Sequence, residues 1–208
     1  MTSVIFLVGR ISFAERNPQE GIKEANFLQA LHLFHEKGYE QVTVQEITAK
    51  CGIGKGTFFN YFAKKEDILL YLGESQIDLL QQSIERHRHI GHPKEQIMQV
   101  LNDLLLHFSS NIELMKLASV EIIKSASLAG KESKSIQQLH LHLASMIDSA
   151  KQNGTLQSRW ETDIIATTIV GVYFHTILSS ALLEVQPTTI SEAFQKQFDV
   201  VWEGIDPN

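Results

Sequence analysis

Residues 43–61 decide the fold, and they read Thr-Val-Gln-Glu-Ile-Thr-Ala-Lys-Cys-Gly-Ile-Gly-Lys-Gly-Thr-Phe-Phe-Asn-Tyr. Thr43 and Glu46 have the Thr-x-x-Glu spacing of a capping box, in which the hydroxyl and the carboxylate each bond a free backbone amide. A helix is therefore predicted to begin at Val44. It is short and ends by Gly52, because glycine tolerates the conformation that terminates a helix.

A turn over residues 51–54 leads into a second short helix over residues 55–61. This order of helix, glycine turn and helix predicts a helix-turn-helix, whose second helix enters the major groove of DNA. Glycine at position 56 would let the backbone approach a phosphate closely. The side chains expected on the inner faces are Ile47, Ile53, Phe58 and Phe62, and those expected to face outward are Lys55, Thr57 and Asn60.

Apolar residues repeat at helical spacing along the rest of the chain, which predicts an all-α fold. Phe27, Leu31 and Phe34 mark a helix that stops at Gly38. The small polar stretch 125–135 is predicted to be a loop. Further apolar stripes run over Leu69–Ile84, Ile97–Phe108, Met115–Ile122 and Ile136–Ile147, and the last two helices are expected at residues 161–184 and 189–203.

The composition indicates a folded protein with two different tasks. The chain has 208 residues, 43% of them hydrophobic, and a net charge of −6. Residues 1–72 hold 8 basic and 8 acidic side chains, so the net charge of −6 arises entirely from residues 73–208. The single cysteine, Cys51, excludes a disulfide framework and indicates a reducing compartment, and residues 4–8 make a poor signal peptide. The predicted location is the cytoplasm.

Residues 27–72 closely resemble the DNA-binding domain of the tetracycline-repressor (TetR) family of bacterial transcription regulators. The resemblance implies an N-terminal extension at residues 1–22 and a three-helix helix-turn-helix domain at residues 23–65. A six-helix domain for effector binding and dimerisation would follow at residues 66–208. Four features coincide at family spacing: Leu33-Phe34 before Lys37-Gly38-Tyr39, Thr43 before Glu46-Ile47, Gly52 before Lys55-Gly56-Thr57, and Tyr61-Phe62 before Lys65-Glu66.

The resemblance also implies which residues meet DNA. Three of them approach bases or phosphates, three hold the DNA backbone, and Asn60 pairs with an adenine edge or a phosphate. Phe59 belongs to the same set, but it stands where the family often has a tyrosine, so one hydroxyl contact is missing. Gly54 replaces the usual serine, which weakens the helix cap. The residues that would approach bases or phosphates are Lys55, Gly56 and Thr57, and those that would hold the DNA backbone are Thr43, Tyr61 and Lys65.

As a whole, the resemblance predicts a homodimeric, ligand-responsive repressor. It would read a pseudo-palindromic DNA operator and be released from it by a small-molecule effector. The helices at 161–184 and 189–203 would form the dimer interface. Residues that could line the effector cavity are Met98, Phe108, Met115, Met146, Tyr173, Phe174 and His175, although side chains at helical spacing are often simply core.

Other readings of the chain stay open at this point. A helical enzyme or ligand carrier with a vestigial DNA-binding domain is the main alternative, although no catalytic arrangement, cofactor fingerprint or metal site is predicted. Residues 164–183 carry no Asp, Glu, Lys or Arg, so a membrane anchor competes with a buried interface helix, which is the preferred reading. His87, His89 and His92 are expected in a solvated loop, and Cys51 is expected as a small buried filler.

Overall fold

The computed structural model describes residues 18–110, 126–182 and 189–205. Within these ranges the regular secondary structure is entirely helical, which confirms the predicted all-α fold. The predicted helix around Met115 lies outside the described residues. The chain forms two compact units, residues 1–72 and residues 73–208, and each is described by itself.

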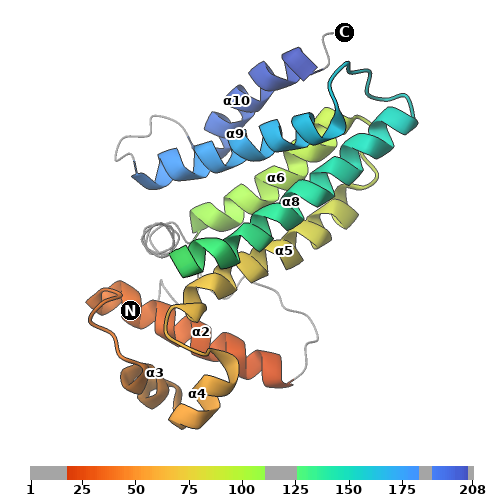
Figure 1. The fold of residues 1–208 in the computed structure, drawn as a ribbon. Helices are drawn as coiled ribbons and strands as arrows, with labels where there is room; N and C mark the ends of the chain where they lie inside the picture. Colours follow the sequence, from red (N-terminus) through yellow and green to blue (C-terminus); the bar gives the residue numbers. More distant parts are fainter. Residues whose placement is uncertain (1–17, 111–125, 183–188, 206–208) are drawn as a thin grey trace. The chain divides into compact units, whose positions relative to one another are not determined.

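The N-terminal unit consists of α2 (Pro18–Lys37), α3 (Val44–Cys51), α4 (Lys55–Tyr61) and the beginning of α5 (Asp67–His87), as Figure 1 shows. The first of these helices begins at Pro18, within the stretch expected to precede the domain. It ends where predicted, because Gly38 has a φ of +83° and donates its N–H to the carbonyl oxygen of Phe34 at 2.9 Å.

The inner faces of α3 and α4 meet α2 and the start of α5 in an apolar core. Ile47 and Phe58 are fully buried, as predicted. Ile53 is only half-buried, because it lies in the turn between the two helices, where one side remains open to solvent. Other buried side chains of this unit are Phe27, Ala30, Leu31, Leu33, Phe34, Tyr39, Val42, Phe62, Ile68, Leu69 and Leu70.

The described part of the C-terminal unit contains the rest of α5, α6 (Pro93–Ser110), α8 (Ala126–Gln152), α9 (Thr162–Leu182) and α10 (Ile190–Ile205). Helix α9 packs against α8 and α10, and α6 packs against the same two helices (Figure 1). The predicted stripe of α6 is buried throughout. The core of this unit includes Leu80, Ile97, Leu101, Leu105, Leu139, Leu143, Ile147, Ile165, Ile169, Phe194, Phe198 and Trp202.

Two predictions for α8 are wrong. The expected loop at 125–135 is helical from Ala126 onward, because serine and lysine are tolerated within helices and Gly130 alone does not end one. Ile136, expected in the core, is 36% exposed. Periodicity identifies the apolar side of a helix, but not the point along the helix at which its packing partner ends.

Helix α9 is the most apolar helix of the described chain, and by length and composition alone its segment Thr162–Ser180 could cross a membrane. One third of that segment is buried within this unit. Its buried residues, among them Ile165, Ile169 and Tyr173, belong to the core formed with α8 and α10. This side of α9 is therefore a core side, as expected for a buried helix, whereas the opposite side carries the exposed residues of the described helix.

Candidate nucleic-acid interface

A network of polar contacts fixes the start of α3. The Thr43 hydroxyl accepts the N–H of Glu46 at 3.2 Å, and Glu46 Oε2 accepts the N–H of Thr43 at 2.9 Å, which confirms the predicted capping box. The Thr43 hydroxyl also donates to Glu46 Oε2 at 3.1 Å. Thr43, which the resemblance placed on the DNA backbone, is therefore the N-cap of α3 in this structure.

Lys37, at the end of α2, completes this network through a contact that the sequence analysis did not predict. Its Nζ donates to Glu46 Oε1 at 2.7 Å. The hydrogen bond from Lys37 and those from Thr43 lower the pKa of Glu46 to about 2. The capping carboxylate is thus ionised at neutral pH, and it joins the last turn of α2 to the first turn of α3.

A glycine turn connects α3 to α4. Gly52 ends α3 with a φ of +68°, the left-handed conformation that favours glycine, and its N–H donates to the carbonyl oxygen of Ala49 at 3.3 Å. Gly54 precedes α4 and supplies no side-chain cap, as expected from its replacement of serine. Cys51, expected to be buried, is half-buried, and burial raises the pKa of its thiol.

Helix α4 buries one side and exposes the other. Phe58 is fully buried, whereas Lys55, Gly56, Phe59 and Asn60 are exposed on the opposite side. We call these four residues the outer face of α4. The half-buried residues of the helix, Thr57 and Tyr61, lie beside this face. Lys55 reaches back to α3, where its Nζ lies 3.4 Å from Gln45 Oε1.

Lys65, expected to hold DNA, has a role within the protein that the sequence did not indicate. Its Nζ donates to the carbonyl oxygens of Tyr39 at 2.8 Å and Val42 at 3.0 Å, and it lies 4.1 Å from the centroid of the Tyr39 ring. An ammonium group has three N–H donors, so these two bonds leave one. Lys65 therefore fastens the α2–α3 connection to the residues that precede α5.

The residues expected to line an effector cavity are distributed through the C-terminal unit. Tyr173 and Phe108 are buried in its core, and burial raises the pKa of the Tyr173 phenol well above its usual range. His175, in contrast, is exposed on α9. Met115 lies outside the described residues. The half-buried members of the set, which pack against the core, are Met98, Met146 and Phe174.

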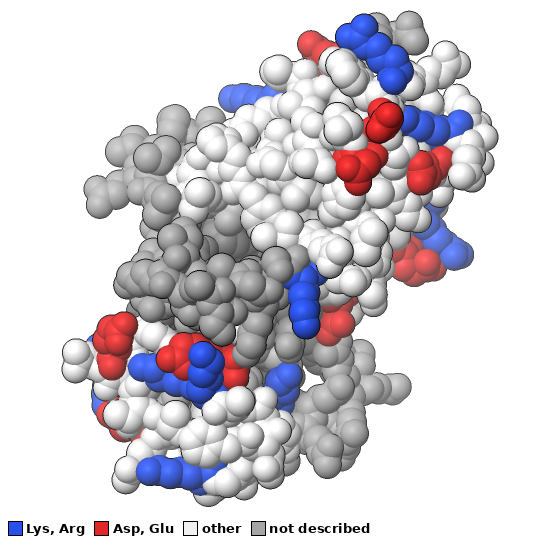
Figure 2. Space-filling view, viewed as in Figure 1, with Lys and Arg blue, Asp and Glu red and all other residues white. Residues whose placement is uncertain are grey.

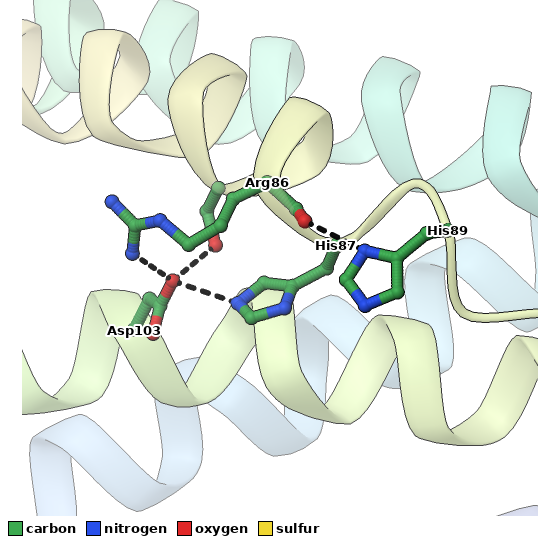
Figure 3. Close-up of polar contacts among 5 residues, drawn as sticks. Arg86, His87, His89 and Asp103 are labelled. Carbon is green, nitrogen blue, oxygen red and sulfur yellow. Dashed lines mark hydrogen bonds and ion pairs between the residues drawn. The ribbon is translucent and has the colours of Figure 1, made fainter.

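The histidine cluster after α5 is not simply a solvated loop. His87 is the last residue of α5, and its Nε2 lies 3.0 Å from Asp103 Oδ2 on α6 (Figure 3). The same oxygen accepts hydrogen bonds from Arg86 at 2.8 Å and from the buried Ser83 at 2.7 Å. This carboxylate joins α5 to α6. Among the described residues, no three His, Cys, Asp or Glu side chains gather as metal ligands.

The geometry defines a class of protein: a helix-turn-helix with a solvent-facing second helix, followed by a helical C-terminal unit. Residues 28–72 match the family model described as bacterial regulatory proteins, tetR family. Residues 28–72, which contain the helix-turn-helix, therefore belong to this family.

One relative in sequence is the HTH-type transcriptional regulator YerO of Bacillus subtilis (strain 168). The two chains are 26% identical over 196 residues, which cover 88% of this chain and 65% of YerO. The chain thus spans less than two thirds of the length of that relative.

Two solved structures share the fold. FadR of Thermus thermophilus, a TetR-family repressor in complex with lauroyl-CoA, aligns with a TM-score of 0.68 and 21% identity over 88% of this chain and 94% of FadR. FadR of Bacillus subtilis, in complex with stearoyl-CoA, aligns with a TM-score of 0.73 and 19% identity over 88% of this chain and 98% of that one. These similarities support the all-helical fold over the aligned 88% of this chain.

Proposed function

We propose that this protein is a transcriptional repressor that binds a pseudo-palindromic operator as a homodimer and leaves it when a small-molecule effector binds. The observation that carries the proposal is the outer face of α4. A buried aromatic side chain, Phe58, anchors the helix from behind, while Lys55, Gly56, Phe59 and Asn60 face solvent. Such a rigid, exposed second helix is what a major groove admits.

We assign the contacts within this interface by chemistry. Lys55 donates to guanine or phosphate, and Asn60 has the paired donor and acceptor that an adenine edge requires. Gly56 lets the backbone approach the DNA, with Thr57 beside it. Tyr61 and Thr43 lie at the edge of the interface, where the DNA backbone would pass. Lys65 offers its third N–H to a phosphate while its other two remain on Tyr39 and Val42.

Dimerisation through α9 is supported by the exposed residues of that helix. Ile164 is 51% exposed and Leu178 is 40% exposed, and both recur on the side of α9 that faces away from the core. Figure 2 shows a wide uncharged area over the middle of α9. We assign residues 161–184 and 189–203 to the interface, because a second copy would cover this uncharged surface and its exposed apolar side chains. The exposed positions at helical spacing between these two residues are Thr167, Thr168, Gly171 and His175.

The effector would bind in the C-terminal unit, near Met98, Phe108, Met146, Tyr173 and Phe174. Its binding must favour the arrangement that cannot hold the operator, since a ligand shifts an equilibrium only through its differential affinity for the two states. Two fold neighbours carry acyl-CoA thioesters, lauroyl-CoA and stearoyl-CoA. Fatty acyl-CoA is therefore the first class of effector to test.

The direct test is binding of the full-length protein to DNA. We would select duplexes from a random pool, measure fluorescence anisotropy with the selected sequence, and repeat the titration with stearoyl-CoA and with free coenzyme A. Enrichment of an inverted repeat would support the proposal. So would a loss of base preference at one position of the duplex in the Asn60→Ala variant. Recovery of no sequence preference at low salt would overturn it. If acyl-CoA of several chain lengths leaves the affinity for the selected DNA unchanged, only the choice of effector would be overturned.

A further inference from the structure

Phe59 is the one residue of the outer face of α4 that has no polar side-chain atom and no use in the contacts assigned above. Its side chain is 49% exposed, although it is a large aromatic group. It can neither donate a hydrogen bond to a phosphate nor pair with a polar base edge. An explanation of its position in the interface must therefore rest on apolar contact.

The ring of Phe59 is held in place from below. It packs edge-on against the buried ring of Phe58, with centroids 5.4 Å apart and an interplanar angle of 87°. Phe58 in turn packs against Phe62, which is also buried. The half-exposed ring of Phe59 is thus the last in a series of ring contacts that begins in the core.

The surface beside the ring is open on the N-terminal side. Gly56 lies one helical turn before Phe59, and a Cβ atom built there would meet nothing within 4 Å. Lys55 and Asn60, the polar members of the outer face, flank this opening on the same short helix. A base-pair edge that Lys55 or Asn60 contacts would therefore lie within reach of the Phe59 ring.

The major groove offers one apolar group on its base pairs, the C5-methyl of thymine. We propose that Phe59 is a specificity-determining residue that recognises a thymine in each half-site through contact with that methyl group. The inference rests on the proposed function, because it requires α4 to enter the major groove. It goes further in naming the base, the chemical group that is read and the side chain that reads it.

The test uses deoxyuridine, which pairs as thymidine does and differs from it only by the missing methyl. The full-length protein and the duplex selected from a random pool would be titrated with each thymidine replaced in turn by deoxyuridine. For the wild type, one position in each half-site should lose affinity about fourfold, which corresponds to burial of one methyl group worth about 0.8 kcal/mol. Other thymines should show no effect.

Two variants complete the experiment. In Phe59→Ala, the duplexes with thymidine and with deoxyuridine at that position should bind equally well. In the matched control, Lys55→Ala, both duplexes should bind more weakly while the ratio of their affinities stays as in the wild type. A selected duplex that tolerates deoxyuridine at every position would overturn the inference and leave the proposed function standing. Discrimination that persists in Phe59→Ala would do the same, since another residue would then contact the methyl. Failure to select any sequence would overturn both.

Discussion

Lys65 donates hydrogen bonds to the carbonyl oxygens of Tyr39 and Val42, at 2.8 and 3.0 Å, and thereby joins two segments that are more than twenty residues apart in the sequence. One segment leads into α3 and the other into α5. A residue expected to serve only the DNA is therefore also part of the framework that orients the helix-turn-helix.

We expect Lys65→Met to lower the free energy of unfolding by about 1 to 2 kcal/mol, because two part-buried carbonyl groups would lose a charged donor. The methionine keeps the apolar stem of the side chain. The matched control is Lys64→Met, at an exposed neighbouring position, which should leave stability unchanged. Urea unfolding followed by circular dichroism measures both. Equal stability of the two variants would contradict the framework role of Lys65.

The same variant tests the proposed phosphate contact. If the third N–H of Lys65 lies on a phosphate, the slope of the logarithm of the binding constant against the logarithm of salt concentration should fall by about 1 in Lys65→Met. Binding should weaken to a similar degree for all sequences. A slope identical to that of the wild type would restrict Lys65 to its role within the protein.

The capping box should make the stability of the N-terminal unit depend on pH. The pKa of Glu46 is lowered from 4.5 to about 2 in the folded chain, so the carboxylate stabilises the fold above the unfolded pKa. This contribution is lost as the pH falls from about 4.5 towards 2. The difference in unfolding free energy between the wild type and Glu46→Gln should therefore be largest near neutral pH and shrink in that interval.

Lys37→Met serves as the companion variant for this pH dependence. Lys37 is the largest cause of the lowered pKa of Glu46, so its removal should raise that pKa towards 4.5. Side-chain carboxyl titration by NMR would report the change directly. The unfolding free energies of the wild type and Glu46→Gln could instead differ by the same amount from pH 7 to pH 2. That result would show that ionisation of the carboxylate does not stabilise the fold.

Gly56→Ala should separate folding from DNA binding. A Cβ at this position meets nothing within the protein, and alanine is the better helix former by about 0.5 to 1 kcal/mol. We therefore expect the variant to be slightly more stable and yet to bind the operator at least tenfold more weakly, because the methyl group would obstruct close approach of the DNA. Gly204→Ala, a similar change in α10, is the control. Undiminished operator binding by Gly56→Ala would remove Gly56 from the interface.

Gly171→Glu should dissociate the proposed dimer without unfolding the chain. Gly171 is exposed on α9 with open space around it, so the single chain can accept a larger side chain there. Two charged groups brought together in an apolar interface would be strongly unfavourable. Sedimentation equilibrium should give twice 23.5 kDa for the wild type and 23.5 kDa for the variant. Gly91→Glu, in the connection before α6, should leave the mass unchanged, and a dimeric Gly171→Glu would exclude this face.

Much of the N-terminal unit could be predicted because its determinants are local. The pair Thr43 and Glu46 fixes the start of α3 within four residues of chain, and glycine at position 38 fixes the end of α2. The roles of Lys37 and Lys65 could not be predicted, because their partners lie 9 to 26 residues away in the sequence. Neither lysine interrupts a helical pattern, so the periodicity of apolar residues could not predict these contacts.

The C-terminal unit was less predictable for a different reason. An apolar stripe shows which side of a helix is buried but not where the neighbouring helices end, as the exposure of Ile136 demonstrates. The small polar residues at the start of α8 are typical of a loop, although the segment is helical. Likewise, Tyr173 and His175 are two residues apart on α9, yet the first is buried and the second is exposed. Only packing decides which polar tip could meet a ligand.

The uncovered side of α9 also has a consequence for how the protein matures in the cell. If the proposed dimer forms, a newly synthesised chain would carry Ile164 and Leu178 in contact with water until a second copy covers them. Assembly would then contribute to folding by mass action, so the thermal midpoint should climb as the protein is concentrated. The fraction of folded protein would accordingly depend on the concentration of the protein in the cell.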